Sequence, residues 1–149
     1  MSNDIVLATR FGAESEEPAR VAANLARLTG GSVTIVYVAS ELAAVTAAAG
    51  EAGVQPAEER DLQLQKIRDQ LRDFVAAHFA EMETESRVRE GNVAETIADV
   101  AAELNAAYLV VGTRGRSSLA RLILGDTTHS ILQHAPCPVV VVPLHGAGH

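Results

Sequence analysis

The sequence has only one cysteine, Cys137, among its 149 residues. No disulfide can form within such a chain, which favours a reducing compartment. Cys137 stands between two prolines and before a run of valines, where a small buried hydrophobic side chain is favoured over a nucleophile. Tryptophan is absent and aromatic residues make up 3% of the chain, so we expect an aliphatic core.

Basic residues are also scarce, because 12 Lys and Arg stand against 19 Asp and Glu and the net charge is −7. This balance argues against nucleic acid and anionic membranes as partners, since both are bound by neutralising phosphates with Lys and Arg. Three of the arginines, Arg114, Arg116 and Arg121, nevertheless fall in one short segment. They are suited either to bidentate phosphate contacts or to a solvated loop.

Long apolar runs are missing as well. No stretch reaches the ~18 apolar residues of a membrane helix, and Met1–Ile5 has neither the basic start nor the apolar core of a signal peptide. We therefore expect a cytoplasmic protein without a membrane partner. No internal repeat or low-complexity linker divides the chain, which predicts a single domain over 1–149 with a flexible tail at 144–149.

Short β-branched runs alternate with helical segments along the chain. The predicted strands are Ile5–Thr9, Ser32–Val38, Ser86–Glu90, Tyr108–Val111 and Val139–Val142. The predicted helices are Glu17–Leu28, with Ser15 as its N-cap, Glu58–Met82, Ala94–Leu104 and one that begins near Thr127. Ala39–Gly53 is either a weak helix or a mobile insertion. The alternation predicts an α/β fold, a doubly wound five-stranded parallel sheet in which the charged strand Ser86–Glu90 lies at an edge.

The most distinctive segment comes after the strand that ends at Val111. Glycines stand at 112, 115 and 125, and Asp126-Thr127-Thr128 then begins a helix. Glycine lets backbone amides approach a ligand closely, and a helix N-terminus attracts anions, so the segment is a candidate phosphate loop. An ordinary turn after a buried strand would explain the same residues. The segment is neither a Walker loop nor the Gly-x-Gly-x-x-Gly dinucleotide pattern.

A family resemblance rests on this segment and on the C-terminal strand. Gly112-x-x-Gly115, nine further residues, Gly125 with a hydroxyl-bearing helix start, and the ending His134-Ala-Pro-Cys-Pro-Val-Val-Val-Val142 resemble the universal stress protein family over nearly the whole chain. The resemblance implies an adenine nucleotide alpha hydrolase-like sandwich with strand order 3-2-1-4-5. Many members bind ATP at the glycine loop and form homodimers through the last strand, whereas others bind no nucleotide. ATP is therefore the expected cofactor, and Mg²⁺ would accompany it.

The resemblance also implies a set of site residues. The nucleotide-binding residues would be Ala8, Thr9, Arg10, Val38, Val111, Gly112, Arg114, Gly115, Arg116, Gly125, Asp126, Thr127 and Thr128. The dimer interface would be Val139, Val140, Val141 and Val142, although the same strand could be buried in a monomer. The implied function is a stress-response or regulatory dimer that binds ATP or AMP, and the alternative is an interaction module that acts through its dimer surface without nucleotide.

Two positions depart from the nucleotide-binding members, which usually carry Asp where Arg10 stands and Ser where Asp126 stands. A carboxylate about 4 Å from a phosphate costs roughly 1 kcal/mol in water, so Asp126 penalises ATP unless it serves only as a helix cap. The opposite charges suggest that Arg10 and Asp126 pair and partly close the empty site. On that hypothesis, Arg10→Asp with Asp126→Ser should raise nucleotide affinity.

Catalysis has little support in the sequence. Asp126, His129 and Ser130 are near one another, but no oxyanion arrangement accompanies them, so no catalytic residue is assigned. Asp126 is the only acidic residue of the loop that could hold Mg²⁺, which leaves at most a weak ATPase. His78 lies on an apolar helix stripe with no second ligand at i+4, so we expect a structural histidine and assign no metal site.

Overall fold

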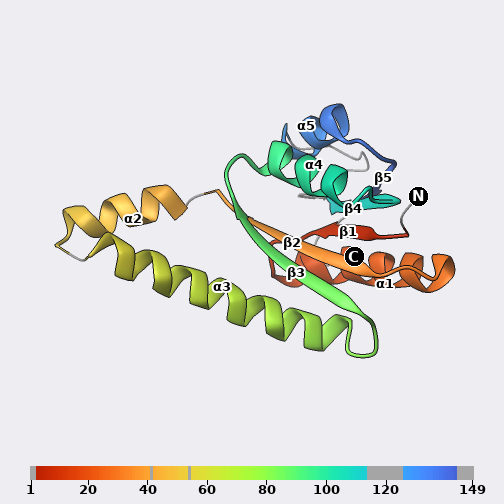
Figure 1. Ribbon diagram of the computed structural model, residues 1–149, viewed down its shortest axis with the longest axis horizontal. Helices are drawn as coiled ribbons and strands as arrows, with labels where there is room; N and C mark the ends of the chain where they lie inside the picture. The colour runs from red at the N-terminus through yellow and green to blue at the C-terminus, as the bar shows by residue number, and fades with distance from the viewer. Residues whose placement is uncertain (1–2, 41, 54, 114–125, 144–149) are drawn as a thin grey trace.

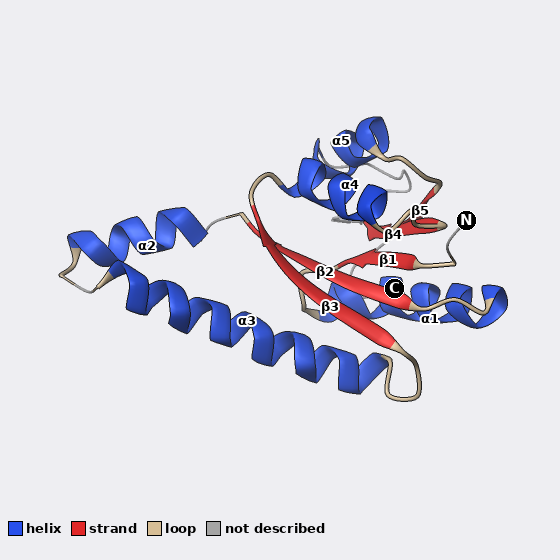
Figure 2. Ribbon diagram, in the orientation of Figure 1, coloured by secondary structure: helices blue, strands red, loops and turns tan. Residues whose placement is uncertain are grey.

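The computed structural model describes residues 3–40, 42–53, 55–113 and 126–143 (Figure 1). Five parallel strands form one sheet in the order β3-β2-β1-β4-β5, which confirms the expected topology (Figure 2). The strands are β1 (Ile5–Ala8), β2 (Val33–Ala39), β3 (Thr84–Glu90), β4 (Tyr108–Gly112) and β5 (Val139–Val142). The sheet is doubly wound because the chain leaves β1 towards one face and β4 towards the other.

Helices cover both faces of the sheet. They are the short 3-10 turn η1 (Ala13–Ser15), then α1 (Glu16–Thr29), α2 (Leu42–Glu51), α3 (Pro56–His78), α4 (Val93–Glu103) and α5 (Asp126–His134). In Figure 1, α1 and α3 lie on one side of the sheet, and α4 and α5 lie on the other. Of the two alternatives for Ala39–Gly53, the structure has the helix, α2.

Each central strand contributes to two apolar cores. Ile5 and Leu7 of β1 pack with α1 and α3, whereas Val6 packs with α4 on the opposite face. Successive side chains of a strand point to opposite faces, so a strand that is covered on both sides must be apolar throughout. The cores are aliphatic as expected, and within the described ranges Phe74 and Phe79 are the only buried aromatic residues.

The outer strand β3 is the edge that its charges predicted. It pairs with β2 alone in the described sheet, and its Arg87 and Arg89 bind Glu103 of α4 at 3.2 and 2.9 Å. The Arg89 guanidinium lowers the pKa of Glu103. Charged side chains along a free edge hinder pairing with other chains. Arg60 of α3 binds Glu90 at the end of the same strand.

The long helix α3 extends beyond the sheet. Its buried residues, Ile67, Leu71 and Phe74, all belong to its C-terminal half, while α2 and the N-terminal half of α3 project away from the strands in Figure 1. The ring of His78 lies 4.7 Å from the ring of Phe74, as a structural histidine would. Across the described ranges, no helix is both long and apolar enough to cross a membrane.

One local prediction is wrong. Ser15 does occupy the N-cap position of α1, but its side chain makes no capping hydrogen bond. The backbone of Ser15 has φ −88° and ψ −12°, whereas a capping serine requires an extended backbone to reach the free amides of the first turn. Ser15 instead lines a cavity beyond the carboxyl ends of the strands.

Candidate functional site

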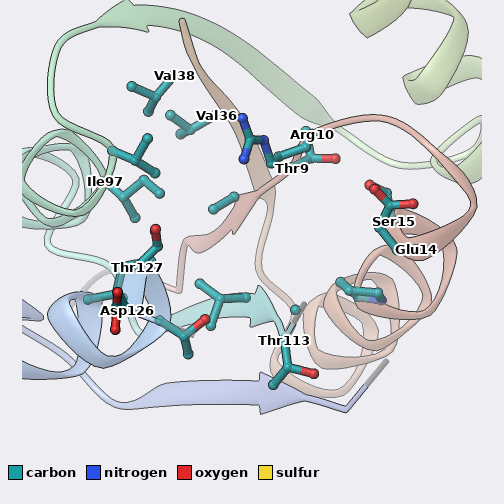
Figure 3. Close-up of a pocket in the computed structure, with 17 residues that line it drawn as sticks. Thr9, Arg10, Glu14, Ser15, Val36, Val38, Ile97, Thr113, Asp126 and Thr127 are labelled. Carbon is teal, nitrogen blue, oxygen red and sulfur yellow. The ribbon is translucent and has the colours of Figure 1, made fainter. Parts of the chain in front are cut away.

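A cavity lies beyond the carboxyl ends of β1 and β4. These strands are neighbours in the sheet, and their connections lead to helices on opposite faces, which leaves a crevice beyond their carboxyl ends. The cavity has a volume of about 370 Å³ and is shown in Figure 3. We call it the crevice pocket.

The crevice pocket gathers every predicted nucleotide-binding residue that the structure describes. These nine residues are Ala8, Thr9, Arg10, Val38, Val111, Gly112, Asp126, Thr127 and Thr128. The other four, Arg114, Gly115, Arg116 and Gly125, lie outside the described residues. Residues from four separate segments therefore line one cavity.

The walls of the crevice pocket are mainly aliphatic. Val36 and Val38 of β2 lie beside Ile97 of α4 in Figure 3, and Val111 and Ile131 complete the apolar surface. Val38 and Ile131 are 7% and 3% exposed, so their side chains are fixed by packing. Rigid aliphatic walls of this kind suit the faces of a flat, weakly polar ring.

Hydroxyl groups are placed among these apolar walls. Thr9, Ser15, Thr113 and Thr128 are all buried, with exposed fractions from 1% to 7%, and all four line the cavity. The Thr9 hydroxyl accepts a hydrogen bond from the Phe11 amide at 3.4 Å. A few fixed polar groups within an apolar cavity orient a ligand and favour ligands whose polar atoms match them.

The described walls carry one positive charge, Arg10, and two negative charges, Glu14 and Asp126. Arg10 and Asp126 are both exposed, and Figure 3 places them on opposite sides of the cavity. No ion pair joins them in the described parts of the chain, so the expected pairing is wrong. Two groups separated by an open cavity are each hydrated and have no need of a partner.

Eight lining residues were not assigned to the site from the sequence: Glu14, Ser15, Pro18, Val36, Val93, Ile97, Thr113 and Ile131. Glu14, Ser15 and Pro18 come shortly after Arg10, and a crevice between β1 and β4 must be bordered by the connection from β1 to α1. Ile97 and Ile131 gave no such signal, because an apolar residue that faces a cavity has the same helical spacing as one that faces the core.

The crevice pocket contains no catalytic constellation among the residues that the structure places. No group of three or more His, Cys, Asp or Glu side chains is arranged to hold a metal ion there. Of Asp126, His129 and Ser130, only Asp126 lines the cavity.

The predicted dimer strand lies at the other edge of the sheet. β5 pairs with β4 alone among the described strands, and Val139, Val140 and Val141 are half-buried. Cys137, just before β5, is also partly buried, and this burial raises the pKa of its thiol.

Comparisons with known proteins agree with this architecture. The family model described as the universal stress protein family matches residues 1–143. A universal stress protein of Mycolicibacterium smegmatis is 32% identical over 145 residues, which are 95% of this chain and 48% of that protein. The chain spans about half the length, or less, of the curated relatives that it matches.

Solved structures show the same fold. A Lactobacillus plantarum universal stress protein is 26% identical, with a TM-score of 0.71 over 94% of this chain and 97% of that chain. A universal stress protein of Archaeoglobus fulgidus, solved in complex with dAMP, is 20% identical, with a TM-score of 0.68 over 95% and 98% of the two chains. A universal stress protein solved in complex with cAMP is also 20% identical, with a TM-score of 0.61 over 96% and 98%.

Proposed function

Because the chain belongs to the universal stress protein family, we propose that the crevice pocket binds an adenine nucleotide and that the protein acts as a cytoplasmic stress-response or regulatory protein. The observation that carries this proposal is the convergence of nine candidate residues on one cavity of about 370 Å³. Two universal stress proteins with this fold were solved in complex with the adenine nucleotides dAMP and cAMP, which supports the same ligand class.

The chemistry of the walls fits such a ligand. A face of an adenine ring would pack on the aliphatic wall that contains Val38 and Ile97, and its polar edge would meet buried hydroxyls such as that of Thr9. The phosphates would lie near Gly112 and the start of α5, where free backbone amides and the helix dipole favour negative charge. With ATP, Mg²⁺ would accompany the phosphates, and hydrolysis would be weak at most.

A pocket-filling substitution tests the ligand site. Val38→Phe would place a ring within the cavity, so we expect at least a tenfold loss of affinity for ATP and AMP. Val88→Phe is the matched control, because Val88 lines a separate groove between α3 and β3 and leaves the crevice pocket unchanged. Calorimetric titration would measure both variants against the parent. Equal affinity in all three proteins, or no binding by the parent, would contradict the proposal.

We also propose that the protein forms a homodimer through β5. Val139–Val142 is an apolar strand at a free edge of the described sheet, and such a strand can pair with its own copy across a two-fold axis. The apolar edge strand β5 also supports the second candidate function, an interaction module that acts through the dimer surface without nucleotide.

Matched lysine substitutions at the two sheet edges test the dimer. Val140→Lys should yield monomers in sedimentation analysis, because it places a charge in the paired edge. Val88→Lys, on the opposite edge strand β3, should sediment as the parent does. A parent that sediments as a monomer, or a Val140→Lys protein that remains dimeric, would exclude this interface.

A further inference from the structure

The connection from β1 to α1 contains a backbone conformation that aromatic residues rarely adopt. Phe11 has φ +57°, and the only other non-glycine residue with positive φ in the described ranges is Asn105. Asparagine tolerates the left-handed region, whereas a bulky residue such as phenylalanine does so only when its surroundings impose that conformation. Contacts of the Phe11 side chain must therefore offset the strain.

Aromatic rings supply those contacts. The ring of Phe11 stacks on that of Tyr37 in β2, with centroids 4.8 Å apart and planes 6° apart. Its edge meets Phe74 of α3, with centroids 6.0 Å apart, and Phe74 in turn contacts Phe79. The whole sequence has only three phenylalanines and two tyrosines, so four of its five aromatic residues gather in this one cluster.

The cluster lies on the face of the sheet opposite the aliphatic pocket walls. Phe11 and Tyr37 pack against the core that α1 and α3 cover, whereas Val36 and Val38 belong to the core on the α4 side. Arg10 and Thr9, immediately before Phe11, line the crevice pocket, and Figure 3 shows Arg10 beside Val36. The left-handed residue therefore allows its own ring and the preceding side chains to reach different faces.

We propose that Phe11 is a positioning residue of the crevice pocket. Its ring, held by Tyr37 and Phe74, fixes the left-handed backbone and thereby presents Thr9 and Arg10 to the ligand. Without the ring the loop relaxes towards negative φ, and the binding-competent fraction of molecules falls. The apparent dissociation constant rises by the inverse of that fraction. This inference rests on the proposed function, because its first readout is nucleotide affinity.

A pair of leucine substitutions tests the assignment. Phe11→Leu removes the stacked ring, and we expect it to raise the dissociation constant for AMP about tenfold. Phe79→Leu is the control, since Phe79 belongs to the same cluster but does not line the pocket. Phe79 is 2% exposed, so Phe79→Leu should lower the melting temperature at least as much as Phe11→Leu does. The AMP affinity of Phe79→Leu should nevertheless stay within about twofold of that of the parent. Equal AMP affinity for Phe11→Leu and the parent would overturn the proposal.

Hydrogen exchange in the ligand-free protein separates this proposal from the proposed function. The Ser15 amide donates to the Gly12 carbonyl at 3.0 Å, so it reports the conformation of the loop directly. Phe11→Leu should accelerate exchange at the Phe11 and Ser15 amides relative to the amides of α4, whereas Phe79→Leu should not. If the parent binds no adenine nucleotide, the proposed function is wrong, and the hydrogen-exchange rates alone test whether Phe11 fixes the loop. Unchanged exchange in Phe11→Leu would then overturn the positioning role.

Discussion

The charges of Arg10 and Asp126 give a quantitative test of the crevice pocket. Both residues line the cavity without pairing, so each should act on a bound phosphate independently. Asp126→Ser removes a negative charge from the start of α5 and should strengthen ATP binding. Arg10→Gln removes the one positive charge of the described walls and should weaken it.

The expected size of each effect comes from Coulomb's law. A unit charge about 6 Å from a phosphate, at an effective dielectric constant of about 60, contributes about 0.9 kcal/mol, or about fivefold in affinity. Adenosine is the matched ligand control, because it has no phosphate and its affinity should not change. At about 1 M salt the Debye length is about 3 Å, so both effects on ATP should largely disappear.

The double variant separates independent charges from a pair. Calorimetry on Arg10→Gln, Asp126→Ser and their combination should give free energies that add within about 0.5 kcal/mol. A coupling energy above about 1 kcal/mol would mean that the two side chains do pair and would refute this reasoning. The combination of Arg10→Asp with Asp126→Ser makes the charge of the pocket one unit more negative, so it should weaken ATP binding. An Arg10–Asp126 ion pair would predict the opposite result, because the double substitution would then open the site.

Two further predictions concern the scaffold. Gly31→Ala should lower the free energy of unfolding by ~3 kcal/mol, because the new Cβ would lie 1.8 Å from the Asn3 carbonyl oxygen. Gly30→Ala should cost only ~1 kcal/mol, since nothing lies within 4 Å and only its left-handed φ of +69° opposes alanine, and equal losses in denaturant titrations would contradict this contrast. The Arg60 guanidinium lowers the pKa of Glu90, and Arg60→Gln should return that pKa towards its ordinary value in a carboxyl NMR titration. The pKa of Glu90 is lower in the folded protein than in the unfolded chain, so the ion pair stabilises the fold fully above the unfolded pKa of ~4.3. This stabilisation is lost as the pH falls through the folded pKa. A difference in stability between the parent and Arg60→Gln that persists in acid would contradict the assignment.

The sequence predicted the bounds of an element well where apolar residues and a proline mark them, and less well where such signals are missing. β5 has the predicted bounds Val139–Val142, because four valines are followed by a proline. β3 begins at Thr84, two residues before the prediction, since one side of an edge strand faces water and gives no apolar signal there. α2 could not be assigned because it projects from the sheet, and its alanine-rich sequence has no distinct apolar stripe.

Some residues of the crevice pocket could be predicted from the sequence and others could not. The resemblance implied that Thr9 and Gly112 belong to the site, and in the structure both lie at the carboxyl ends of adjacent strands. Ile97 could be recognised as inward-facing but not as a pocket wall, since that depends on how far α4 stands from β2. The strained backbone of Phe11 had no sequence signal, because its cause is a set of ring contacts with residues distant in the chain.

The most direct test of the proposed function is mass spectrometry of the small molecules released when freshly purified protein is denatured, followed by calorimetric titration of the emptied protein with ATP and Mg²⁺. We predict that an adenine nucleotide is released, or that ATP binds with a micromolar dissociation constant. A protein that releases no nucleotide, gives no binding heat at several temperatures and shows no thermal shift would contradict the account. Its function would then be sought at the β5 edge.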